Sequence, residues 1–175
     1  SLSAGGGGGA AASFRTENQV SVMPEGRVEF TVNAPIDKNW ELFRNTEIWA
    51  LCIPGCKGVT RISESEWDGL FEVRVLHTSR TVQGRLQMVE ITPPTNIRYQ
   101  GKGELREAFH RYSLTLRAEM SLEAVSDGET RVTFVGDIAA KGLGGAIINK
   151  IVSGKMDELV RGFEQNVRQI LEKER

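Results

Sequence analysis

The sequence is poor in cysteine and histidine, with two residues of each among 175. An extracellular disulfide framework needs more cysteines, so we expect a reducing, cytoplasmic setting. A structural zinc site takes about four N or S ligands, and Cys52 and Cys56 lie far in sequence from His77 and His110. We therefore predict no metal site, and we interpret both cysteines as free thiols packed beside a turn, with a disulfide as the alternative.

An excess of basic charge and long apolar runs are also missing. The formal net charge is -1, which argues against nucleic acid as a partner. No run approaches the roughly 20 apolar residues of a membrane-spanning helix, so any membrane contact is expected to be peripheral. Phosphate-binding loops, dinucleotide fingerprints and nucleophile elbows are absent too. We predict no catalytic residues and no cofactor.

The length suits one domain, which buries roughly 70% of the surface that its unfolded chain exposes. Residues 1–25 include five consecutive glycines, Gly5 to Gly9, and have neither the basic start nor the apolar centre of a signal peptide. We expect a flexible Gly/Ala-rich tail at 1–25, followed by a single domain at 26–175.

Alternation of apolar and polar residues predicts a first strand at 26–32. Two short helices are expected next, at 36–45 and 47–52, the second ending before Pro54 and Gly55. Turn residues at 67–69, 92–96 and 126–128 then divide a long strand-rich region. Six further strands are predicted, at 57–64, 69–79, 82–91, 96–106, 110–124 and 130–140.

The last part of the chain changes to helical spacing. Apolar residues recur three and four positions apart from Ile148 to Leu171, which predicts a helix ending near 173 and roughly 40 Å long. The glycine-rich lead-in at 142–145 favours a hinge or close packing, with an anion site at the helix start as the alternative.

Strands followed by one terminal helix favour an α+β fold, in which a curved seven-stranded antiparallel sheet wraps around the helix. Glycines inside the strand patterns predict the bends that such a curve requires: Gly84, Gly101, Gly103 and Gly136. A curled sheet crossed by a helix leaves room for a small apolar ligand, whose cavity we expect to be lined by Phe71, Val73, Leu86, Met88, Tyr99, Tyr112, Leu114, Phe134, Met156 and Phe163.

His110 and Tyr112 are the polar candidates for this cavity. They lie two residues apart on one predicted strand and so share a face. They could orient a ligand there, whereas the simpler interpretation is a hydrogen-bonded buried tyrosine and a histidine at the rim of the sheet.

One segment resembles a known family. Cys52, Ile53, Pro54, Gly55 and Cys56 look like the Cys-Ile-Pro-Gly-Cys segment of the carbon monoxide dehydrogenase G-subunit family, within the START-like (SRPBCC, helix-grip) superfamily. Thr92-Pro93-Pro94 and the strand residues 99–103 are similar to that family's Pro-Pro hairpin and glycine-rich strand. The resemblance covers about 27–172, and residues 104–111 depart from the family pattern.

The resemblance implies a helix-grip fold and a non-catalytic accessory protein. Such proteins handle a lipophilic molecule such as a quinone and are linked to maturation or membrane recruitment of a molybdenum hydroxylase. Two alternatives stay open at this point. One is a partner-docking protein whose interior is filled by its own side chains, and the other is a cyclase or aromatase using His110, Tyr112 or Glu104.

Overall fold

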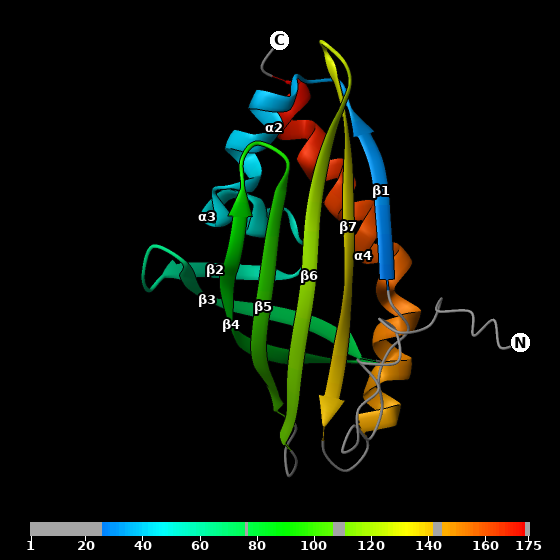
Figure 1. Cartoon of the computed structure of the whole chain (residues 1–175). Helices are drawn as coiled ribbons and strands as arrows, with labels where there is room; N and C mark the ends of the chain where they lie inside the picture. The colour runs from blue at the N-terminus through cyan, green and yellow to red at the C-terminus, as the bar shows by residue number, and fades with distance from the viewer. Residues whose placement is uncertain (1–25, 76, 107–110, 142–144, 174–175) are drawn as a thin grey trace, which may run out of the picture.

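A computed structural model describes residues 26–75, 77–106, 111–141 and 145–173 (Figure 1). Within them the chain forms a seven-stranded antiparallel sheet of order β1-β7-β6-β5-β4-β3-β2. Consecutive strands from β2 to β7 pair with one another, while β1 pairs with β7 at one edge. The strands are β1 (Gly26–Val32), β2 (Cys56–Arg61), β3 (Glu66–Val75), β4 (Thr78–Thr92), β5 (Asn96–Arg106), β6 (Arg111–Ser126) and β7 (Glu129–Lys141).

Helical segments fill one end and one face of this sheet. The connection from β1 to β2 contains α2 (Ile36–Phe43), α3 (Thr46–Trp49) and the short 3-10 helix η1 (Ala50–Cys52). The long helix α4 (Gly145–Glu172) runs along the concave face and ends beside α2 (Figure 1). Its nearest backbone neighbours are β1, β7 and η1. The predicted α+β architecture, with a curved sheet around a C-terminal helix, is confirmed.

Glycines permit the strong curl of the sheet. Gly69 on β3 lies opposite Gly84 on β4, which in turn lies opposite Gly103 on β5. A Cβ atom at Gly84 would lie 3.1 Å from the Lys102 carbonyl oxygen and 3.4 Å from the Cα of Gly103. This spacing leaves little room for a side chain. Beyond these glycines β2 and β3 run across the direction of β6 and β7 (Figure 1).

The turn that follows η1 fixes α4 on the sheet. Gly55 has φ of 90°, a left-handed conformation that glycine adopts readily, and its carbonyl accepts a 2.8 Å hydrogen bond from Glu72 N. The Asn166 side chain on α4 donates a 2.8 Å bond to the Cys52 carbonyl. A Cβ at Gly162 of α4 would lie 2.5 Å from Pro54 Cγ. The segment 52–56 therefore packs against α4 and fixes its position on the sheet.

The C-terminal half of α4 is attached to β1 as well. Arg168 donates two hydrogen bonds, of 3.1 and 3.0 Å, to the Thr31 carbonyl oxygen. The Asn33 backbone N–H donates a 2.8 Å bond to the Glu172 carboxylate. Val167 and Leu171 are buried in the main core between helix and sheet. Polar and apolar contacts thus anchor the same half of the helix.

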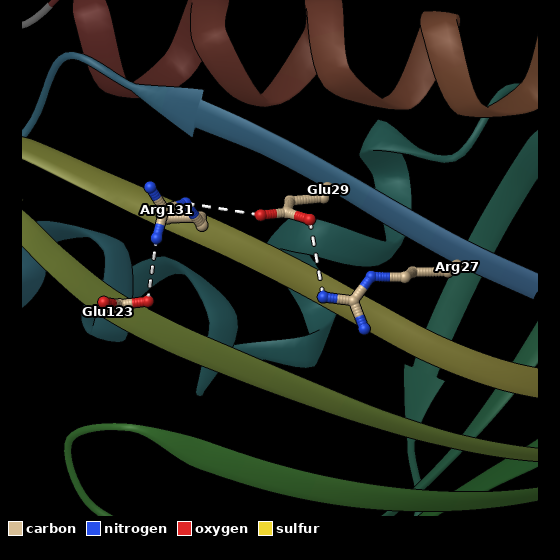
Figure 2. A network of polar contacts seen from close by, with 4 residues as sticks. All are labelled: Arg27, Glu29, Glu123 and Arg131. Atoms are coloured by element: carbon tan, nitrogen blue, oxygen red, sulfur yellow. Dashed lines mark hydrogen bonds and ion pairs between the residues drawn. The ribbon is translucent and has the colours of Figure 1, made fainter.

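The outer face of the sheet carries charged side chains. Arg131 on β7 contacts Glu29 on β1 at 3.3 Å and Glu123 on β6 at 3.0 Å, and Arg27 joins Glu29 at 3.4 Å (Figure 2). Exposed ion pairs of this kind contribute about 0–1 kcal/mol each. The network therefore keeps this face polar and adds little to stability.

The predicted turn at 67–69 is wrong. These residues lie inside β3, and Trp67 is 4% exposed in the core, opposite Leu86 of β4. The connection instead lies at 62–65, where Ile62 N donates to the Glu66 carbonyl oxygen. The predicted break at 80–81 is also wrong, because β3 ends at Val75 and β4 begins at Thr78. Burial of the tryptophan outweighed the turn preference of the Asp-Gly pair after it.

Substitution by alanine at Gly162 and at Gly154 of α4 should change the free energy of unfolding in opposite directions. Gly162→Ala should destabilise the protein by about 1–3 kcal/mol, because the new Cβ meets the Pro54 ring. Gly154→Ala should stabilise it by up to about 1 kcal/mol, because no described residue outside the local helix backbone has an atom within 4 Å of the new Cβ, and glycine is a poor helix former. Urea unfolding of both variants measures these free energies. Changes of the same sign in the two variants would contradict the close contact between α4 and the segment 52–56.

Candidate functional site

An aromatic cluster joins α4 to the sheet and to the short helices. Trp49 of α3 lies 5.3 Å from the Tyr99 ring of β5, and Phe163 of α4 lies 5.4 Å from the Phe134 ring of β7. Trp49 also approaches both Phe134 and Phe163, at 6.2 and 6.3 Å. Edge-to-face geometry dominates these pairs, which suits the quadrupoles of the rings. The cluster closes the α2 end of the space between helix and sheet.

Tyr99 is the polar member of this cluster. It is 3% exposed, and its hydroxyl donates a 3.2 Å hydrogen bond to the Phe43 carbonyl oxygen at the end of α2. Burial raises the pKa of Tyr99 above its ordinary value, and the Trp49 indole beside it offsets a small part of that rise. The side chain is therefore a neutral tether between β5 and α2.

Strand register places every predicted strand residue of the cavity on the concave face. In antiparallel pairs, residues directly opposite one another share a face. Phe71 lies opposite Val82, Tyr99 opposite both Met88 and Ala118, and Leu105 opposite Tyr112. The same face carries Val73, Leu86, Leu114 and Phe134.

The predicted cavity residues divide into three groups by packing. Leu86, Met88, Tyr99, Phe134 and Phe163 belong to or pack against the main core. Tyr112 and Leu114 form a second, smaller cluster with Leu105, Ala140 and Val82 at the far end of the concave face. Phe71, Val73 and Met156 are half-buried and belong to neither cluster. The ligand-binding role of all ten stays a prediction.

Between the two clusters lies a half-buried part of the concave face, which we name the inner apolar strip. The ring of Phe71 lies over Gly69, with Cε2 2.9 Å from the Cβ position of that glycine. Leu116 approaches the corresponding position of Gly101 at 3.3 Å. Glycines leave much of the strip without side chains. Its residues are Gly69, Phe71, Val73, Gly84, Gly101, Gly103, Leu116 and Ile138.

The polar residues proposed from the sequence behave differently from one another. Tyr112 is 7% exposed and lies on the concave face, within the second cluster. Glu104 lies on the opposite, outer face and contacts Arg106 at 3.7 Å, so it is removed as an acid–base candidate inside the fold. His110, the tail 1–25 and residues 142–144 of the glycine-rich lead-in lie outside the described residues.

Both cysteines are free thiols. Cys52 is buried in the main core, and burial raises its pKa to about 11. Cys56 is half-buried at the start of β2, and burial also raises its pKa. A thiol with a raised pKa is a poor nucleophile at neutral pH. The conformation of the segment 52–56 thus serves packing rather than thiol chemistry.

The curled sheet, the long helix on its concave face and the short helices between β1 and β2 define the START-like, helix-grip class of protein. The family model for CoxG, the G-subunit of carbon monoxide dehydrogenase, matches residues 29–172. The chain belongs to this family. No curated protein matches it.

Solved structures share the fold at low sequence identity. A conserved protein from Geobacillus kaustophilus superposes with a TM-score of 0.74 at 17% identity, covering 86% of this chain and 96% of that one. The Zhui aromatase/cyclase from Streptomyces sp. R1128 gives 0.54 at 15% identity, covering 85% and 96%. A START superfamily protein from Mycobacterium smegmatis gives 0.52 at 14% identity, covering 89% and 100%.

Several residues of the concave face were missed by sequence reasoning. Trp67 was assigned to a turn, and Arg80 fell between two predicted strands. Arg80 in fact lies opposite Val73 on the concave face. The alternation Arg80, Val82, Gly84, Leu86 could have extended the predicted strand back to it. The alignment of Gly69, Gly84 and Gly103 requires the register, which no local pattern contains.

Replacing Tyr99 by phenylalanine should cost about 1 kcal/mol of unfolding free energy at neutral pH, because the Phe43 carbonyl loses its donor. The folded pKa lies above the unfolded value of about 10. Above that pH the unfolded tyrosine loses its proton first, so stability should fall as pH rises.

Urea unfolding at several values between pH 9 and 11 measures this slope, with pH values chosen around the unfolded tyrosine pKa of about 10. Cys52 contributes a decline of the same sign in both proteins, so the difference between wild type and Tyr99→Phe isolates the tyrosine. Equal slopes for the two proteins would contradict a buried, neutral Tyr99.

Proposed function

We propose that this protein is a non-catalytic carrier or accessory protein that binds a small apolar molecule, of quinone or lipid type, between the inner apolar strip and α4. The supporting observation is the half-buried state of the strip, which apolar side chains of the protein do not fully cover. Glycines in the strip also provide flat backbone against which a ring or an acyl chain can lie.

Helix α4 supports the proposal from the other side. Met156, Leu159, Val160 and Phe163 are half-buried along its length, while Val167 and Leu171 farther on are fully buried. The helix is therefore anchored at the α2 end, and its described apolar side chains from 156 to 163 are only partly covered. Partly uncovered apolar surface on two facing elements suits an apolar ligand.

The family name motivates the second half of the proposal, in which the protein recruits a molybdenum hydroxylase of the carbon monoxide dehydrogenase type to the membrane. Among the described residues no helix has the length and apolar character needed to cross a membrane. In this proposal, contact with the membrane is peripheral or is made through the partner enzyme. Co-purification with such an enzyme from a host that expresses both tests this part separately.

The ligand itself should be recovered by native mass spectrometry and solvent extraction of protein purified from a quinone-rich host. We expect one apolar molecule per chain. A clean apo mass, together with no binding of added quinone or lipid, would overturn the carrier function and leave partner docking as the role of the fold.

Two tryptophan substitutions test the proposed position of the ligand on the inner apolar strip. Leu116→Trp fills the inner apolar strip opposite Gly101, so occupancy should fall about tenfold or more. Lys102→Trp places the same side chain on the outer face of the neighbouring strand, where Lys102 is exposed, and should leave occupancy unchanged. Equal occupancy in both variants would place the ligand elsewhere.

A further inference from the structure

The charged side chains on the inward face of the described strands all have one sign. At the inward-facing positions of the described strand residues, the charged side chains are Arg61 and Arg80, and none is acidic. Arg61 is exposed near the end of edge strand β2, where its Nε donates a 3.0 Å bond to the Ser63 carbonyl oxygen. Arg80 is the half-buried one, and its Nε atom is fully covered.

Arg80 lies where the inner apolar strip meets the second cluster. It is directly opposite Val73 of the strip and two residues before Val82, which packs against Leu105 and Tyr112. A guanidinium stays charged at all physiological pH values, and its planar group of five N–H donors matches a carboxylate or a phosphate. Arg80 interacts with other groups of the protein, and five donors can serve such a partner and a ligand together.

We propose that Arg80 determines the class of ligand: the bound molecule is an amphiphile whose anionic head group, a carboxylate or a phosphate, pairs with Arg80 while its apolar part lies on the inner apolar strip. This inference rests on the proposed carrier function and narrows it, since a neutral quinone has no charge to offer. Charge-assisted hydrogen bonds to arginine are among the stronger polar contacts in proteins, especially where water is partly excluded.

The test compares a fluorescent fatty acid, cis-parinaric acid, with its uncharged methyl ester on the full chain. The acid should bind about tenfold or more tightly than the ester. Arg80→Gln should remove that preference while leaving ester binding intact, and retained ester binding shows that the variant is folded. Arg80→Lys keeps the charge and should keep part of the preference. Arg74→Gln is the matched control, because Arg74 is exposed on the outer face of the same hairpin.

Displacement of the bound probe by competitors with matched C16 chains, palmitate, lysophosphatidate and hexadecanol, separates a carboxylate from a phosphate head group. Equal affinity for acid and ester, unchanged by Arg80→Gln, would overturn the anionic class and leave the carrier function standing. Failure of both probes, of the quinone and of all competitors to bind would overturn the carrier function itself. A preference that Arg74→Gln also abolishes would mean a general charge effect and would overturn the role of Arg80.

Discussion

The attachment of α4 to the turn at 52–56 is the constraint on which the rest of the structure depends. Gly162 lets the helix approach the Pro54 ring, and Asn166 hydrogen-bonds the Cys52 carbonyl. Gly55 gives that turn its left-handed bend. Because these contacts, with Arg168 and Glu172, lie in one half of the helix, they fix its direction across the sheet. Of the apolar helix residues nearer the middle of α4, Met156, Leu159 and Val160 are half-buried.

The proposed ligand position lies between two apolar clusters. The aromatic cluster around Trp49 fills the anchored end with mostly edge-to-face contacts, and the second cluster around Tyr112 lies towards the far end. Between them, Gly84 and Gly103 let the strands approach and curl, at the cost of side chains that would otherwise fill the interior. The segment 52–56 fixes the position of α4, and the glycines let the sheet bend. The inner apolar strip between the two clusters stays half-buried.

The family relationship supports an accessory role, while the chemistry of the concave face points to particular ligands. A neutral apolar strip would accept quinones and lipids alike. In the proposal above, the half-buried Arg80 beside the strip favours ligands with an anionic head group, because its guanidinium is positively charged. Fold similarity to an aromatase/cyclase at 15% identity does not imply that the two proteins share a reaction. The outward position of Glu104 removes one of the groups such chemistry would have used.

The sequence by itself determined the fold class, the faces of the strands and the family. Period-two alternation identified the inward residues from Phe71 to Phe134, and helical spacing identified α4, because burial of one face leaves a repeating local pattern. Tertiary structure alone decided the alignment of three glycines across β3, β4 and β5 and the burial of Trp67 beside an Asp-Gly pair. These depend on strand register and on packing between distant segments, which no window of neighbouring residues contains.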